Sequence, residues 1–137
     1  MLTAERYHDI SCGHRVFGHE GKCSNLHGHN YRITFVIEGE QDALGRVIDF
    51  SVIKSKLCEW LEKNYDHKFL IWEDDELCDA LALLDPTIVI TGFNPTAENI
   101  AKHLVHAVAP RELEGTGCKL IECKVEETRK CSATFKI

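Results

Sequence analysis

The sequence of 137 residues lacks several features that would place it in other classes of protein. It has no apolar run near 18 residues, so no transmembrane helix is predicted. Its first residues, 1–6, lack the apolar core of a secretion signal. The seven cysteines include no C-x-x-C pair, which disfavours both a zinc ribbon and a disulfide framework. Repeats, linkers and low-complexity segments are also missing. We therefore expect a single cytoplasmic domain over residues 1–137.

Basic residues are scarce relative to acidic ones. The chain has 16 Lys and Arg against 22 Asp and Glu, a net charge of -6. This balance argues against nucleic-acid binding, and no membrane partner is expected. Hydrophobic residues at 44% and charged residues at 28% are ordinary for a globular protein. Any anionic substrate would therefore have to be met by local cations rather than by the overall field.

Histidine is plentiful, and four of the eight lie between Cys12 and Asn30. Residues 27–38 alternate between apolar and polar side chains, which predicts a half-buried strand with His27 and His29 on its apolar face. His14 shares a parity with Ile10, Cys12 and Val16 in an earlier predicted strand, residues 5–17. If the two strands pair antiparallel, three imidazoles converge at one end of an inward face. Three nitrogen ligands with a fourth position open are typical of a catalytic zinc site.

Other histidines offer alternatives to this ligand set. His19 is the rival third ligand, but it lies in a loop-like setting, and His8 would be a more distant neighbour. A single buried histidine is usually a hydrogen-bonded core residue, whereas three on one apolar face need a partner or a cation. His103 and His106 lack a third candidate ligand, so we interpret them as surface or core residues. Gly28 would let the two backbones approach closely.

Later segments predict an α+β fold of order ββααββ, a four-stranded antiparallel sheet with two helices. Ser51 is expected to cap the first helix, which ends near residue 65, and Asn94 or Thr96 the second, which Pro110 ends. The remaining predicted elements are a helix or ordered loop in 73–86, a short buried strand at 88–90, and strands at 120–127 and 131–137.

Four further residues are candidates for chemistry. Cys23 lies in a polar loop beside Lys22, and a nearby cation and metal both favour a thiolate. Asp66 and His67 form a pair that is either a surface feature or a proton carrier for the site. Glu127 continues the more apolar row of its strand. A carboxylate on this side needs hydrogen-bond donors, which makes Glu127 a candidate for binding a ligand.

These residues, in this order, resemble the 6-pyruvoyltetrahydropterin synthase / 6-carboxytetrahydropterin synthase family. The matching pieces are His14, C-S-N-L-H-G-H (23–29), V-I-D-F (47–50), D-H-K-F-L (66–70), N-P-T-A-E-N (94–99) and Glu127-Thr128. The resemblance implies the tunnelling fold, in which three subunits close a barrel and two trimers stack into a homohexamer. The stretch 71–93 is longer than in compact members, Cys12-Gly13 replaces a pair of small residues, and Ala97 stands where Ser is common.

The resemblance also implies a reaction and a role for each residue. Zn²⁺ on His14, His27 and His29 would act on 7,8-dihydroneopterin triphosphate. Cys23 would be the general base, and Asp66 and His67 would relay protons, for a neighbouring subunit if sites are shared. Glu127 would anchor the pterin, with Thr96 and Glu98 lining the pocket. Arg15, Lys22 and Lys54 are hypothesised to meet the triphosphate.

The number of residues between Cys23 and His27 indicates which of the family's products to expect. Three residues separate them, which is similar to the bacterial 6-carboxytetrahydropterin synthases of queuosine biosynthesis, while the pyruvoyl enzymes typically have a longer gap. The expected function is thus a lyase that releases carboxytetrahydropterin, acetaldehyde and triphosphate. The alternatives are a pyruvoyl-type or other pterin side-chain lyase, and a non-enzymatic zinc-stabilised module with Cys23 as the fourth ligand.

Overall fold

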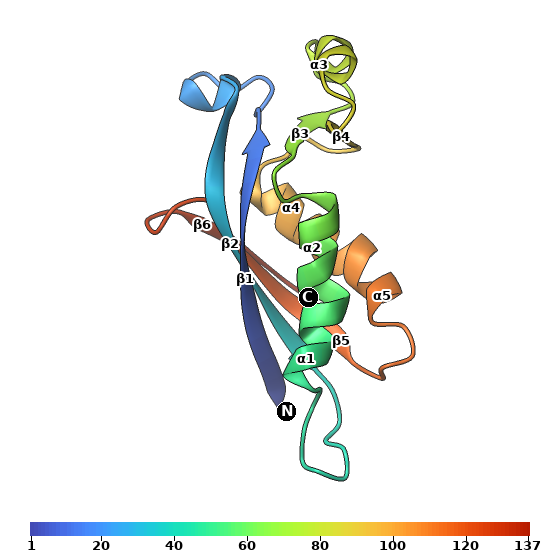
Figure 1. Cartoon of the computed structure of the whole chain (residues 1–137). Helices are drawn as coiled ribbons and strands as arrows, with labels where there is room; N and C mark the ends of the chain where they lie inside the picture. Colours follow the sequence, from blue (N-terminus) through green and yellow to red (C-terminus); the bar gives the residue numbers. More distant parts are fainter.

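The computed structural model describes residues 1–137 as one curled sheet with helices packed on one of its faces (Figure 1). The strands lie in the order β4-β3-β1-β2-β5-β6. Their bounds are β1 (Thr3–His14), β2 (His27–Glu38), β3 (Phe69–Trp72), β4 (Val89–Thr91), β5 (Lys119–Glu126) and β6 (Ser132–Lys136). The four longest strands are antiparallel neighbours, as predicted, whereas β3 and β4 run parallel to β1 and to each other.

The expectation of four strands is therefore wrong, because the sheet has six. Strand β3, with the sequence F-L-I-W, has no apolar–polar alternation, and Leu70 and Ile71 are both buried. A four-residue apolar run of this kind cannot be distinguished by periodicity from a piece of buried helix. The predicted strand at 88–90 is present as β4, but it lies at the edge of the sheet, and Ile90 is exposed rather than buried.

The side chains of the paired strands β1 and β2 alternate between the two faces of the sheet as the sequence predicts. Its register matches Ile10 with Tyr31, Cys12 with His29, and His14 with His27. Side chains of this parity face the helices and form much of the core. Because the side-chain period of a strand is two, this register puts the histidines on the same face as the core residues.

Strand β5 breaks the predicted alternation at its first residues. The register with β2 shifts between Val36 and Ile37, so that Ile37 lies opposite Leu120 and Val36 opposite Glu122. This bulge buries Leu120, which the alternation placed on the polar face. From Cys123 onward the predicted parity holds, and the strand ends one residue before Glu127.

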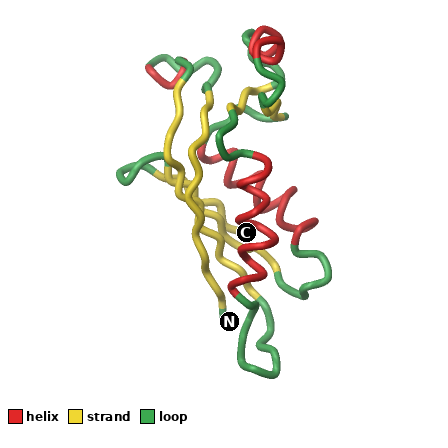
Figure 2. Tube along the Cα trace, in the orientation of Figure 1, coloured by secondary structure: helices red, strands yellow, loops and turns green.

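Two long helices cover the inner face (Figure 2). The first consists of α1 (Phe50–Ile53), a π-helical turn (Lys54–Cys58) and α2 (Glu59–Asn64). Its cap is Asp49, which accepts the Ser51 N–H, so the predicted Ser51 cap is wrong by two residues. The second consists of α4 (Ala97–His103), a π-helical turn (Leu104–Val108) and α5 (Ala109–Glu112), and it begins at the predicted cap Thr96.

Pro110 does not end the second helix, which continues to Glu112. A proline inside a helix lacks an N–H donor and crowds the carbonyl four residues earlier. Here the preceding turn is π-helical, and the Ala109 N–H reaches back to Leu104. This wider turn gives a physical reason why the helix accommodates Pro110.

The segment between the two helices projects from one end of the molecule. It contains β3, α3 (Cys78–Leu84) and β4, and Figure 1 shows α3 standing beyond the body of the fold, at the same end as the loop between β1 and β2. Of the two alternatives expected for 73–86, a helix or an ordered loop, the structure has a helix in Cys78–Leu84. None of the helices has both the length and the apolar character needed to cross a bilayer.

Candidate metal centre and active site

Three histidines meet where β1 ends and β2 begins. The ligand atoms of His14, His27 and His29 all lie within 4.8 Å of one another. Their ring centroids are 4.6 Å apart for His14 and His27, 5.1 Å for His14 and His29, and 4.9 Å for His27 and His29. The predicted convergence of three imidazoles is therefore confirmed, and one metal ion could be held among them.

Backbone carbonyls determine how two of these rings face the centre. The His14 Nδ1–H donates to the Pro95 carbonyl at 2.7 Å, and the His27 Nδ1–H donates to the Asn25 carbonyl at 2.8 Å. Because a carbonyl only accepts, both rings must carry their proton on Nδ1, which leaves Nε2 free as a ligand. The Nε2 atoms of His14 and His29 are buried without a hydrogen-bond partner. Such orphaned nitrogens fit a bound cation.

Burial keeps His14 and His29 in the neutral form that binds metals. It lowers the pKa of His14 to about 4, although the bond to Pro95 opposes this shift, and the other two histidines lower it further. Burial also lowers the pKa of His29. Near neutral pH the imidazoles of His14 and His29 are uncharged, and neutral imidazole suits zinc, copper, iron and nickel.

A close approach of β1 and β2 makes this cluster compact. A Cβ atom on Gly28 would lie 2.9 Å from the Cys12 carbonyl oxygen, nearer than real Cβ atoms come to backbone. Glycine between the two histidines is therefore required for the strands to pair at this distance, as predicted.

Glu127, the residue directly after β5, reaches the cluster. Its Oε2 lies 3.6 Å from His29 Nε2, and its side chain is partly buried. The structure thus places this carboxylate on the histidine side of the sheet, the side that the alternation of β5 predicted. From there it can accept hydrogen bonds from a ligand beside the metal centre.

Cys23 lies in the loop that leads into β2, outside the ligand cluster. It occupies a short 3₁₀ turn (Lys22–Ser24), is partly buried, and its carbonyl accepts the Val16 N–H at 2.8 Å. The group of mutually close ligand atoms contains the three histidines and not this sulfur. A centre with an open fourth position agrees with this arrangement better than a closed four-ligand centre does.

Asp66 and His67 form the predicted pair, with Asp66 Oδ2 2.9 Å from His67 Nδ1. The Ser11 N–H donates to Asp66 Oδ1, and the His67 N–H donates to the Ser11 carbonyl. Burial alone would raise the pKa of Asp66, but these bonds and His67 outweigh it, so that its pKa lies below the usual value. The aspartate is therefore ionised and can orient the ring.

His67 is a surface residue of its own chain. It adopts a left-handed backbone with φ of 59°, and its side chain is 80% exposed. It lines a shallow pocket together with His29 and with Ser11 and Asn30, whose side chains are bonded to each other. The pair is thus presented outward, where a second molecule could use it.

The second helix supplies two further predicted residues. The Thr96 Oγ1 accepts the Asn99 N–H at 3.1 Å as the helix cap, so this hydroxyl already has a structural partner. Glu98 is exposed in the first turn of α4. Their contact with a substrate stays a prediction.

The cations suggested for a triphosphate differ in their surroundings. Arg15 is engaged by Asp75 and Glu76, with which it forms ion pairs. Lys54 is exposed directly after α1, and α1 lies at the end of the molecule away from the loop between β1 and β2 (Figure 1). Lys22 is exposed in the same turn as Cys23 and remains the best placed of the three.

The remaining histidines take part in other contacts. His8 pairs with Glu62 at 2.8 Å, and the His19 Nδ1 accepts the Gly21 N–H at 2.8 Å, so neither joins the ligand cluster. His103 packs against Phe93, and His106 against Phe135. The interpretation of these last two as surface or core residues agrees with those contacts.

Some residues of the site were not predicted. Tyr31 is buried with its ring edge-on to His14 and His29, and its hydroxyl has no partner. Its parity, the same as that of His27 and His29, could have indicated that Tyr31 lies at this site. The Pro95 and Asn25 carbonyls could not be predicted from the sequence, since backbone groups are identical at every position.

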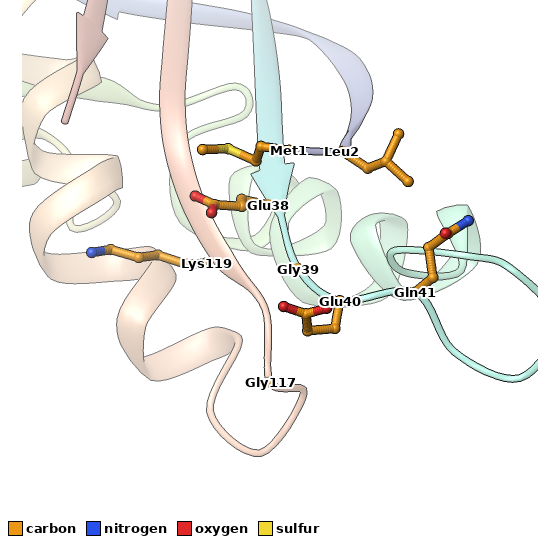
Figure 3. Close-up of a pocket in the computed structure, with 8 residues that line it drawn as sticks. All are labelled: Met1, Leu2, Glu38, Gly39, Glu40, Gln41, Gly117 and Lys119. Carbon is orange, nitrogen blue, oxygen red and sulfur yellow. The ribbon is translucent and has the colours of Figure 1, made fainter.

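A separate pocket of about 780 Å³, near Glu38 and Lys119 at the far end of β2, contains none of the predicted residues (Figure 3).

The fold and this cluster define an α+β protein with a candidate three-histidine metal centre. The family model described as 6-pyruvoyl tetrahydropterin synthase matches residues 3–137. A 6-carboxy-5,6,7,8-tetrahydropterin synthase of Rickettsia felis is 36% identical over 134 residues, which cover 96% of this chain and 97% of the relative. The chain therefore belongs to the 6-pyruvoyl tetrahydropterin synthase family, enzymes that act on small pterin substrates.

Solved structures share the same fold. An uncharacterized protein from Wolinella succinogenes gives a TM-score of 0.87 at 22% identity, covering 98% of this chain and 97% of that one. The 6-pyruvoyl tetrahydropterin synthase of Caenorhabditis elegans gives 0.70 at 26% identity, covering 99% and 95%. At such identities the similarity supports the architecture more strongly than it supports any one product.

Proposed function

We propose that this protein is a zinc-dependent 6-carboxy-5,6,7,8-tetrahydropterin synthase. Its substrate is 7,8-dihydroneopterin triphosphate, and its products are carboxytetrahydropterin, acetaldehyde and triphosphate. The observation that carries the proposal is the cluster of His14, His27 and His29 with Glu127 at its edge, and Cys23 lies in the turn that leads into β2. The 36% identity to a carboxytetrahydropterin synthase over nearly the whole chain supports this product rather than the pyruvoyl one.

Each chemical task in the reaction has a candidate residue. Zinc on the three histidines would supply Lewis acidity and orient the side-chain hydroxyls of the substrate. Cys23, as thiolate, takes a proton from the substrate side chain. Glu127 accepts hydrogen bonds from the amino and ring N–H groups of the pterin, which fixes the ring relative to the centre. Thr96 and Glu98 line the pocket, and Lys22 meets the triphosphate.

Proton relay is proposed to come from a second subunit. His67 is oriented by Asp66, and its side chain is 80% exposed, which supports a site shared between neighbouring subunits. A homohexamer built from two trimers would bring each pair to a neighbour's centre. We also propose a cytoplasmic location and a place in queuosine biosynthesis.

Incubation of zinc-loaded protein with 7,8-dihydroneopterin triphosphate, with products identified by mass, tests the proposal. The carboxy branch leaves one side-chain carbon on the pterin and releases the other two as acetaldehyde. A pyruvoyl product would retain all three carbons, keeping the site but changing the assignment. Absence of turnover with zinc bound would favour a non-enzymatic module or another pterin substrate.

A further inference from the structure

The turn that carries Cys23 is connected to the rest of the fold through very few backbone bonds. The Cys23 carbonyl accepts the Val16 N–H at 2.8 Å, whereas the Ser24 and Asn25 N–H groups bond within the turn itself. Val16 lies past the end of β1, where the pairing with β2 and β3 has stopped. The position of Cys23 therefore depends on what holds residues 15–17.

Residues 15–17 are held by the projecting segment between the two helices. The Asn94 side chain accepts the Phe17 N–H at 3.0 Å and donates to the Phe17 carbonyl at 2.9 Å. On the other side of Val16, the Arg15 Nε lies 3.1 Å from Asp75 Oδ2. The residue bonded to Cys23 is thus flanked by two side-chain contacts from one segment.

Asp75 differs sharply from the acidic residue beside it. The side chain of Asp75 is 0% exposed, and its Oδ1 accepts the Leu77 N–H at 2.9 Å. Glu76 reaches the same guanidinium at 3.4 Å, but its side chain is 73% exposed. A buried ion pair depends on its geometry and is costly to break from one side, whereas an exposed pair contributes little.

We propose that Asp75 is a positioning residue for Cys23, which it orients through Arg15 and the Val16–Cys23 backbone bond. The proposal rests on the proposed function, in which Cys23 acts as the base. The segment 71–93 then has a role in the site, since it supplies the buried carboxylate that holds residues 15–17, to which the turn with Cys23 is bonded. A misplacement of about 1 Å at a reacting group can cost on the order of 100-fold in rate.

Asp75→Asn tests the proposal, with Glu76→Gln as its matched control. Asparagine keeps an oxygen for the Leu77 N–H but presents no charge to Arg15. We expect hydrogen exchange of the Val16 amide and the 18–26 loop to become at least about tenfold faster. We further expect kcat to fall about 10- to 100-fold while KM changes by less than about threefold. Glu76→Gln should stay within about twofold of the unsubstituted protein in each measurement.

Two results would overturn the proposal. One is unchanged exchange and kcat in Asp75→Asn. The other is an exchange increase spread over the whole chain, which would mean a general structural role. Exchange is measured without substrate, so faster exchange at Val16 in a protein that turns over no pterin would retain the contact network and reject the function instead.

Arg15→Lys provides a second variant if Asp75→Asn does not fold. Lysine keeps the positive charge but cannot engage two carboxylates in the fixed geometry of a guanidinium. It should raise exchange at Val16 in the same direction and by a smaller factor than Asp75→Asn. Exchange at Val16 equal to that of the unsubstituted protein would contradict the role assigned to the Arg15–Asp75 pair.

Discussion

Two regions build the candidate site, and they hold their residues in different ways. The paired ends of β1 and β2 carry all three histidines on one continuous backbone ladder. The region from Asp66 to Asn94 contributes through separate contacts, such as the Asn94 amide on Phe17 and the buried Asp75 beside Arg15. A ladder fixes each side chain through many bonds at once, whereas a separate contact can be lost alone.

This difference suits the work of each region. Metal ligands have to converge within a narrow range of geometry, and a rigid strand pair provides that convergence. In the proposed function, the outward Asp66–His67 pair of the second region relays protons, a task in which groups tighten around a bound substrate. The ring of His14, on the ladder, bonds to the carbonyl of Pro95, the residue that directly follows the second region.

The largest expected effect, on metal affinity and turnover, comes from replacing one of the three histidines on the ladder of β1 and β2. His27→Ala should lower metal affinity by more than the roughly 10–100-fold that loss of an outer-shell partner costs, and should abolish turnover. Metal content after dialysis, measured by atomic emission, checks this. His19→Ala, in the exposed loop, is the control and should retain its metal. Metal retention in His27→Ala would transfer the ligand role to His8 or His19.

The second prediction separates chemistry from metal binding. Cys23→Ala should keep its metal, because the sulfur lies outside the ligand cluster, yet lose about 10²–10⁴-fold in kcat. Cys131→Ala, exposed in the turn between β5 and β6, should change neither quantity. Activity that survives in Cys23→Ala would mean that the base is another group.

Mixing of two inactive variants tests whether the regions come from different subunits. If Cys23→Ala and His67→Ala subunits exchange freely, about one quarter of the sites will combine an intact cysteine with an intact histidine. Recovery of about that fraction of activity supports shared sites. No recovery, with exchange of labelled subunits demonstrated, would assign both residues to one chain.

A smaller effect is expected from a change in the spacing of the ladder. Gly28→Ala places a Cβ atom 2.9 Å from the Cys12 carbonyl, so the strands must separate. We expect the free energy of unfolding to fall by about 1–3 kcal/mol, with weaker metal binding. Gly92→Ala is the matched control, since nothing lies within 4 Å of its Cβ position. Urea unfolding of both variants measures the difference, and equal stabilities would contradict the close approach.

The same contrast explains which parts of the molecule could be predicted from the sequence. Alternation in 27–38 is a local property, so it indicated the strand, its inward face and the convergence of His27 and His29 with His14. The helix cap at Thr96 was equally local. Glu127 could be assigned to the histidine side because parity in β5 holds from Cys123 onward.

What the sequence did not reveal depends on contacts between distant segments. The strand β3 became visible only through its pairing with β1, and the burial of Leu120 only through the bulge opposite β2. Orientation of the His14 ring requires a carbonyl 81 residues away. Arg15 looked like a free cation for phosphate until Asp75 was found beside it. A charge count along the chain cannot show such pairing.

The smallest predicted effect is a loss of folding stability at acidic pH that involves the second helix. His103 is partly buried against Phe93, whose ring centroid lies 4.9 Å away, and burial lowers the pKa of His103 below its usual 6.5. The unfolded chain therefore binds a proton more readily than the folded one. Stability from this group is present above about pH 6.5 and is lost as the pH falls through the lowered value.

Urea unfolding at pH 7.5 and pH 5 measures this loss. His103→Gln should show a smaller decrease in stability between the two values than the unsubstituted protein, because glutamine does not titrate. His106→Gln is the control on the same helix, since His106 is exposed, and it should leave the decrease unchanged. An identical decrease in all three proteins would assign the acid sensitivity to other groups. The contact between Phe93 and His103 would then not link the projecting segment to the second helix in a pH-dependent way.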